Sequence, residues 1–311
     1  MEEINKKMIC GFWRRIAAFI IDVIILSAIG FILGLLLEDV FVQLGEWGRL
    51  IGFIISISYF GIMNSSKFDG QTFGKKLFKI QVVDSSNSTI GLSKSFLRYS
   101  FLAAPFSLNG IHITDQTVSS YLAYPLSFII FGGVFSIVYL YLFNRVTRQS
   151  LHDLMVGTYV VNISRSQERF GMIWRPHLFI VSSLFVIGTA SPEIASKFIE
   201  NEPFQEILLT QQTINKLDVV RYAGVMQSSR VLTSAKSGNS SSFTYVSAQV
   251  NLYEKDVGNN DFARELAELV VSSYPDSRSQ NLIQISLIYG YDIGIWSKWY
   301  KENYSFNPNE I

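Results

Sequence analysis

Asp22 is the first residue whose position suggests chemistry, because it interrupts a long apolar run. Six apolar or small residues precede it from Ile16, and fifteen follow it up to Leu37. An ionised carboxylate inside a bilayer costs on the order of 3 kcal/mol on insertion scales. Such a group needs a cationic partner, a water-filled cavity or a proton. Asp22 therefore indicates either an ion or proton relay or a structural clamp between helices.

Arg15 lies seven residues before Asp22, and this spacing places both on nearly the same face of a helix. Seven steps of about 100° leave an offset of about 20° between them. The same spacing separates them by about 10 Å along the axis, so direct pairing requires Arg15 to reach down. Helical phase favours Arg15 over its neighbour Arg14 as the partner on this face. Both charges are expected to face a common bundle interior.

A second charged cluster, RVTRQSLHDLMVGT, occupies residues 145–158. Arg145 and Arg148 end a strong apolar run, and His152 and Asp153 follow on an expected short interfacial helix. Two uses stay open for this cluster. It is either a gate or proton exchanger at the inner mouth, or a helix whose charges meet the lipid headgroups and pair with the two arginines.

Composition places these charges in a membrane protein. Charged residues make up 16% of the 311, apolar residues 49% and aromatic residues 14%, with a net charge of +1. This composition excludes a disordered chain and disfavours a nucleic-acid binder, which needs a basic surface. Residues 1–194 hold 28 charges with a net +4, whereas residues 195–311 hold 23 with a net −3. The first part is predicted to lie in the membrane and the second to be a soluble domain.

Several apolar stretches are predicted to cross the bilayer, which requires about 20 mainly apolar residues per helix. The four clearest are 16–37, 50–64, 121–143 and 177–191. Cationic residues favour the cytoplasmic side of a membrane. The N-terminus and the connections 65–98 and 144–176 are basic and are expected inside, while the acidic connection 38–47 is expected outside.

The stretch 96–111 decides the number of crossings. Two basic connections on the same side need an even number of crossings between them, so 96–111 is expected to cross as well, with 112–120 as the outer turn. This gives about five transmembrane helices and places the C-terminal domain outside. If 96–111 lies flat in the interface instead, the C-terminal domain is inside.

The C-terminal part has the pattern of a small soluble α+β domain. Strands are predicted at 217–226, 243–253 and 282–293, the last two from alternation of apolar and polar residues. Helices are predicted near 203–216 and at 261–273, the latter with Asn260 as its N-cap. The aromatic residues Trp296, Trp299 and Tyr300 occur at helical spacing. Short strands are also expected in the first part, at 78–83 and 158–162.

Four sequence blocks together resemble the Arg-Asp-Asp (RDD) family of bacterial membrane proteins. They are GFWRRIAAFIID at 11–22, DGQTFGKKLFKIQVVD at 69–84, SFLRY at 95–99 and RQSLHDLMVGTYVV at 148–161. The resemblance covers residues 10–162 and implies that the three namesake residues are Arg15, Asp22 and Asp153. It also implies an integral protein of the inner or plasma membrane, with ion or solute transport suggested for some members. The region from 177 onward departs from the minimal family pattern.

The resulting organisation has three parts: an RDD-like transmembrane domain at 1–165 with a cytoplasmic loop at 65–98, a linker and final transmembrane helix at 166–194, and the soluble domain at 195–311. The candidate charge set is Arg15, Asp22 and Asp153, with His152 and Arg148 as accessory residues. We expect no catalytic residues, no metal and no cofactor, because no zinc spacing or hydrolase motif is present.

Two functions follow as hypotheses. The first is a multi-pass membrane protein that moves an ion or small solute through the bundle. The alternative is a membrane scaffold or anchor that presents the C-terminal domain to a protein partner. Neither hypothesis requires an enzyme or a nucleic acid, and both have the lipid bilayer as a partner.

Overall fold

The computed structural model describes residues 9–109, 116–163, 170–199, 202–233 and 240–311. These form two compact units. Unit 1 contains Met1–Leu36, Glu46–Ile194 and Ile293–Trp296, and unit 2 contains Leu37–Gly45, Ala195–Asp292 and Ser297–Ile311. The chain therefore combines a helical N-terminal region with a sheet-rich C-terminal domain, as the sequence predicts.

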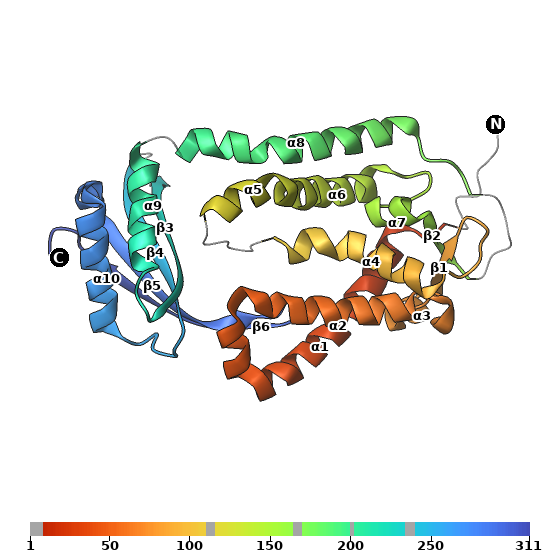
Figure 1. Ribbon diagram of the computed structural model, residues 1–311, viewed down its shortest axis with the longest axis horizontal. Helices are drawn as coiled ribbons and strands as arrows, with labels where there is room; N and C mark the ends of the chain where they lie inside the picture. The colour runs from red at the N-terminus through yellow and green to blue at the C-terminus, as the bar shows by residue number, and fades with distance from the viewer. Residues whose placement is uncertain (1–8, 110–115, 164–169, 200–201, 234–239) are drawn as a thin grey trace. The chain divides into compact units, whose positions relative to one another are not determined.

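Unit 1 is built on long apolar helices. They are α1 Phe12–Leu44, α2 Gly48–Met63, α4 Leu92–Ser107, α5 Gln116–Ser127, α6 Gly133–Phe143 and α8 Arg175–Ile199. The π-helical turn Phe128–Gly132 joins α5 to α6, and the 3-10 turn Gly45–Trp47 joins α1 to α2. Figure 1 shows α2, α4, α6 and α8 running side by side.

Three helical stretches of the described residues are long and apolar enough to span a membrane: Phe12–Met63, Tyr121–Phe143 and Arg175–Ile194. The first contains both α1 and α2. The predicted count of about five crossings is not confirmed, because α4 has only 16 residues and begins with a polar turn. Residues 110–115 of the expected outer turn lie outside the described residues.

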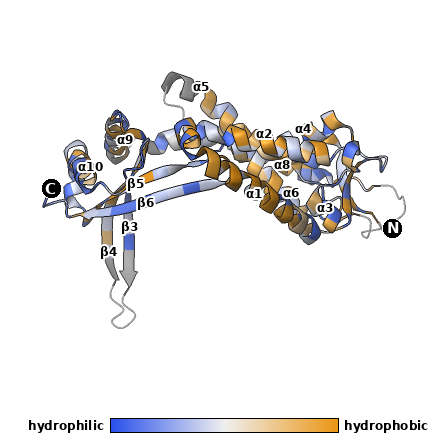
Figure 2. Cartoon of the chain, turned by 90° about the horizontal axis from the view of Figure 1, so that it is seen from below, coloured by the Kyte–Doolittle hydropathy of each residue, from blue (hydrophilic) through white to orange (hydrophobic). Residues whose placement is uncertain are grey.

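The helices of unit 1 carry their apolar side chains outward. Leu36, Ile54, Phe179 and Val186 are each more than half exposed, and Figure 2 shows α1 and α2 as strongly hydrophobic. Polar side chains occupy the interior instead, including Arg15, Asp22 and Asp153. Exposed apolar surface of this extent is typical of helices in contact with lipid.

α1 departs from the expected connection at 38–47. The helix continues to Leu44, and only Leu37 has non-helical backbone angles, with φ −131° and ψ 27°. The segment beyond this break belongs to unit 2, where Phe41 and Val42 are buried. The connection predicted at 38–47 is therefore mostly helical, because these residues gain a buried apolar contact by staying helical.

Short elements fill the rest of unit 1. The strands β1 Ile80–Asp84 and β2 Thr158–Asn162 pair antiparallel, which confirms both strands predicted in the first part. The helix α3 Phe73–Leu77 precedes β1, and α7 Leu151–Val156 precedes β2. The 3-10 turn Ser66–Phe68 follows α2. These elements bring the 69–84 and 148–161 sequence blocks together.

Unit 2 contains a four-stranded sheet in the order β3-β4-β5-β6. The strands are β3 Val220–Thr233, β4 Ser240–Leu252, β5 Leu282–Asp292 and β6 Ser297–Phe306. β4 and β5 are parallel, and the other two pairs are antiparallel. The helix α9 Glu202–Ile214 contacts β3, and α10 Asn260–Ser273 lies in the crossover between β4 and β5 and contacts β5. A short 3-10 turn, Pro275–Ser279, follows α10.

Two features of this domain differ from what the sequence pattern indicates. The N-cap of α10 is Asn259 rather than Asn260, since its side chain accepts a hydrogen bond from the Phe262 amide at 2.9 Å. Trp299 and Tyr300 lie in the strand β6, not in a helix, because this segment pairs along its whole length with β5.

Candidate functional site

Asp153 occupies the first turn of α7, where the local sequence fixes its direction. Ser150 is the N-cap residue, and its amide lies 3.4 Å from Asp153 Oδ2. The Ser150 hydroxyl donates to the Ile137 carbonyl of α6 at 3.2 Å. Gly157 ends the helix in the left-handed region, with φ 62°. α7 therefore holds Asp153 against the neighbouring helices.

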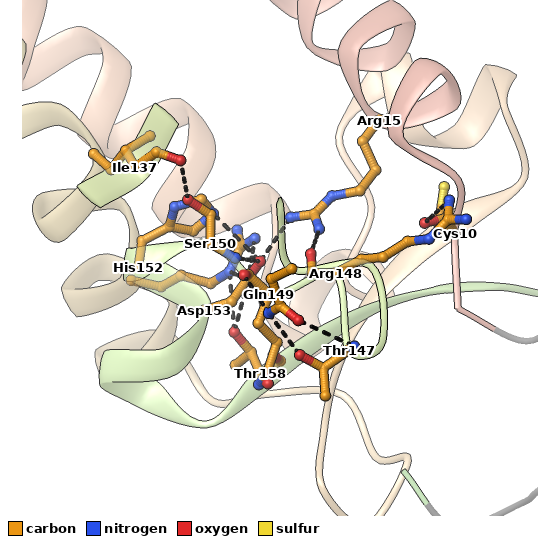
Figure 3. A network of polar contacts seen from close by, with 12 residues as sticks. Cys10, Arg15, Ile137, Thr147, Arg148, Gln149, Ser150, His152, Asp153 and Thr158 are labelled. Atoms are coloured by element: carbon orange, nitrogen blue, oxygen red, sulfur yellow. Dashed lines mark hydrogen bonds and ion pairs between the residues drawn. The ribbon is translucent and has the colours of Figure 1, made fainter. Parts of the chain in front are cut away.

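Two arginines and a threonine surround the Asp153 carboxylate, and Figure 3 labels Arg15 and the threonine, Thr158. Arg15 Nη2 lies 2.6 Å from Oδ2, and Arg98 donates to Oδ1 through Nη2 at 2.7 Å and Nε at 2.9 Å. The Thr158 hydroxyl donates to Oδ1 at 3.0 Å. All four side chains are buried. The carboxylate thus ties α1, α4, α7 and β2 together.

The charges of this cluster determine its protonation. Burial alone would raise the pKa of the Asp153 carboxyl, but the guanidinium charges of Arg98 and Arg15 hold it well below its usual range. Asp153 is therefore an anion at any physiological pH. Neutralising it would leave two guanidinium groups buried without a counter-charge.

Arg148 contributes its main chain rather than its charge. Arg15 donates to the Arg148 carbonyl oxygen, and Arg148 adopts a left-handed backbone with φ 52°. Its own side chain extends to the Cys10 carbonyl at 3.5 Å (Figure 3). The expected pairing of Asp153 with Arg145 or Arg148 was therefore wrong, because Arg15 and Arg98 occupy the carboxylate.

His152 is buried beside Asp153 as a neutral group. Its Nε2 lies 3.6 Å from Asp153 Oδ2, and its Nδ1 has no hydrogen-bond partner among the residues that the structure describes. Burial lowers the pKa of His152 to about 3, and the nearby arginines add to this shift against the pull of Asp153. An imidazole in this state does not exchange a proton near pH 7.

Asp22 has a different environment, which no sequence pattern predicted. Oδ1 accepts from the Tyr59 hydroxyl at 2.8 Å and from the Gly74 amide at 2.9 Å, and Oδ2 accepts from the Thr72 hydroxyl at 2.6 Å. Asp22 is only 1% exposed. Within the described part of the chain, its hydrogen-bond donors are all neutral and it forms no ion pair.

The sequence GQTFGKK explains how α3 reaches Asp22. Thr72 caps α3, and its side chain accepts from the Lys75 amide while its hydroxyl donates to Asp22. At Gly74 a Cβ atom would lie 2.0 Å from the Ala18 carbonyl oxygen. Only glycine therefore allows α3 to approach α1 closely enough for the Gly74 amide to reach the carboxylate.

The structure brings some of the predicted residues together and separates others. Arg15, Asp153, His152 and the Arg148 carbonyl form one cluster, while Asp22 contacts none of them. Sequence reasoning missed the carboxylate partners Tyr59, Thr72, Gly74, Arg98 and Thr158. Four of these five lie in the blocks 69–84, 95–99 and 148–161, as the partners of a shared site would. No group of three or more His, Cys, Asp or Glu among the described residues is arranged to hold a metal ion.

Comparison with known proteins shows which family this region resembles. Residues 9–157 match the model of the RDD family. The uncharacterized protein YxaI of Bacillus subtilis (strain 168) is 27% identical over 172 residues, which cover 49% of this chain and 95% of YxaI. No solved structure matches the chain. The matched region contains both buried carboxylates and all of their hydrogen-bond partners except Thr158.

Proposed function

Because residues 9–157 belong to the RDD family, we propose that this membrane protein transports a cation or a proton and that Asp22 supplies the negative charge on the path. The proposal is not enzymatic. It assigns different tasks to the two buried carboxylates, since their surroundings differ.

The environment of Asp22 carries this proposal. Asp22 lies in α1, within the first stretch long and apolar enough to span a membrane. Intramembrane carboxylates commonly mark ion or proton pathways. All three donors to Asp22 are neutral, so a cation or proton can replace one of them without breaking a buried ion pair. Breaking such a pair costs about 3–5 kcal/mol.

The Asp153 cluster is assigned a structural task. Its carboxylate is already paired with two buried guanidinium groups, which leaves no charge for a passing cation. It connects the first turn of α1 and the middle of α4 to α7 and β2. A rigid base of this kind holds Asp22 and its donors in place while a cargo exchanges.

Flux measurements on reconstituted protein test the role of Asp22. We expect the full chain in proteoliposomes to move a monovalent cation or protons, and D22N to lose at least about tenfold of that flux, which corresponds to about 1.4 kcal/mol. D69N is the matched control, because Asp69 is exposed and its left-handed backbone suits asparagine. Unchanged flux in D22N, or no flux in the wild-type protein, would falsify the proposal.

A second candidate function is a membrane scaffold that presents residues 195–311 to a protein partner. It is favoured by the separate apolar core of unit 2, which includes Val246, Val250, Leu266, Ile285 and Leu287. We expect affinity capture with the full chain from its native membrane to recover a stoichiometric partner. Persistent flux without any such partner would argue against this function.

We place the protein in the plasma or inner membrane. In the proposed orientation its N-terminus lies in the cytoplasm. This orientation places the C-terminal domain outside, which requires an odd number of crossings. Reporter fusions at Ile311 test this orientation directly, since an active cytoplasmic reporter there would require an even number of crossings and would place 96–111 flat in the interface.

A further inference from the structure

Lys75 is a cation of unit 1 that the two aspartate sites do not use as a partner. It lies in α3, directly after Gly74, and keeps a partly exposed side chain. Its Nζ atom lies 2.5 Å from Asn64 Oδ1. Asn64 is itself buried and fixed, because its side-chain amide donates to the Phe60 carbonyl at 2.8 Å. The hydrogen-bond partner of the Lys75 amine is therefore a neutral amide oxygen.

A neutral partner makes loss of a proton inexpensive for Lys75. An amide oxygen accepts a hydrogen bond from an ammonium and from a neutral amine alike. The contact with Asn64 Oδ1 therefore survives deprotonation. A lysine paired with a carboxylate would instead lose an ion pair at that step.

The surrounding charges also favour loss of a proton from Lys75. Lys75 lies within electrostatic range of charged or titratable groups on α1, α4 and α7 and on the segment before α1, which are Asp22, Arg15, Arg98, Asp153, His152 and Cys10. His152 is neutral, and burial raises the pKa of the Cys10 thiol, so that thiol is neutral too. The remaining set has three cations, counting Lys75, and two carboxylates.

We propose that Lys75 is the proton-exchanging group of this charged cluster. The cluster has one net positive charge when Lys75 is protonated and none when it is not. In the exchange an N–H bond of the ammonium breaks, the nitrogen keeps the electron pair, and the proton passes to water at the exposed part of the side chain. The role of this exchange in transport rests on the proposed function, whereas the exchange itself does not.

The energetics agree with the geometry. Burial lowers the pKa of Lys75 to about 7, with a further lowering from Arg98 and Arg15 that Asp22 and Asp153 oppose. The Lys75 amide lies 3.2 Å from Thr72 Oγ1, whose hydroxyl donates to Asp22. The backbone of Lys75 is therefore linked to Asp22 through Thr72, and the Lys75 ammonium interacts with the Asp22 carboxylate electrostatically. A proton on Lys75 adds a cation near the carboxylate and weakens its attraction for a cationic cargo.

A titration that needs no transport tests the exchange. The full chain, labelled with ¹³C,¹⁵N-lysine and placed in lipid nanodiscs, is titrated by NMR, and the Lys75 side-chain signal is assigned by its loss in K75R. K76R is the matched control, because Lys76 is the next residue and is exposed. A midpoint below about pH 8.5 supports the proposal, and a higher midpoint, towards the ordinary lysine value of about 10.4, overturns it.

Flux profiles then test whether transport uses the exchange. We expect cation flux in wild-type proteoliposomes to change several-fold between pH 6 and pH 8, and to become flat in K75R, which keeps its charge, and in K75M, which has none. A wild-type pH profile in K75R overturns the coupling. If no wild-type flux is found but Lys75 titrates near pH 7, the proposed transport fails and the proton exchange stands.

Discussion

Asp153 and Asp22 are both buried carboxylates of unit 1, and the groups around them differ in charge. Asp153 accepts from two guanidinium groups, a hydroxyl and a main-chain amide, whereas Asp22 accepts from two hydroxyls and a main-chain amide. The first arrangement is neutralised by residues that cannot lose their protons. The second has three neutral hydrogen-bond donors and no ion pair among the residues that the structure describes.

The difference teaches how a helical bundle can hold charges for two purposes. Ion pairs between helices resist separation, because removing one partner leaves the other buried and unpaired. Hydrogen bonds from neutral donors each contribute only about 0.5–1.5 kcal/mol, so they can be exchanged for another ligand. Asp153 is accordingly suited to holding helices together, and Asp22 is suited to exchanging its hydrogen-bond partners for another ligand. The following three predictions test this division.

The largest expected effect is the loss of stability in D153N. Asparagine keeps the size of the side chain but leaves the guanidinium groups of Arg15 and Arg98 without a counter-charge. We expect a loss of about 3–5 kcal/mol in the free energy of unfolding, visible as aggregation or a much lower melting temperature in detergent. D69N serves as the matched control here as well. Equal melting temperatures of D153N and D69N would show that the cluster does not fasten the helices.

A second effect, of intermediate size, is a loss of folding stability at acidic pH. The pKa of His152 is about 3 in the folded protein and about 6.5 when unfolded, so between these values the unfolded chain binds more protons. Stability therefore falls as the pH is lowered below about 6.5, by at most about 1.4 kcal/mol per pH unit. Asp153 adds little to this slope, because its contribution is lost only below the ordinary aspartate value of about 3.9.

Melting curves between pH 7 and pH 5 measure this effect. We expect the wild-type melting temperature to decrease with acid and H152Q to lack the part of the slope due to His152. H177Q is the comparison, since His177 bonds Tyr139 and lies outside the Asp153 cluster. Parallel slopes in the wild-type protein and H152Q would mean that His152 is not held neutral by burial.

The sequence predicted much of this arrangement. Long apolar runs give the helices α1, α2, α6 and α8, since twenty apolar residues have few other stable structures in lipid. Helical phase correctly placed Arg15 and Asp22 on a buried face. Alternation gave β4 and β5, whose inward residues Val246 and Ile285 are fully buried.

Partners distant in sequence could not be predicted in the same way. Arg98 lies 55 residues from Asp153, and Thr72 lies 50 residues from Asp22, so only the packing of α3 and α4 brings them together. Arg145 and Arg148 were favoured as partners because they are close in sequence, but the left-handed turn at Arg148 directs its carbonyl, not its guanidinium, to Arg15. β6 was missed for a similar reason, since its pairing with β5 decides its structure.

The smallest expected effect tests whether the donors to Asp22 are individually replaceable. Y59F removes one hydroxyl, 2.8 Å from Oδ1, and leaves the Gly74 amide on the same oxygen. We expect a loss of about 0.5–1.5 kcal/mol in the free energy of unfolding, well below that of D153N, because the carboxylate keeps two donors. Y99F is the matched control, since Tyr99 stacks on Phe60 at 4.6 Å in the same region without bonding Asp22. Flux in Y59F should change while its fold persists. A collapse of the fold in Y59F, as severe as that in D153N, would instead show that Asp22 is fastened in the same way as Asp153 and does not exchange its partners.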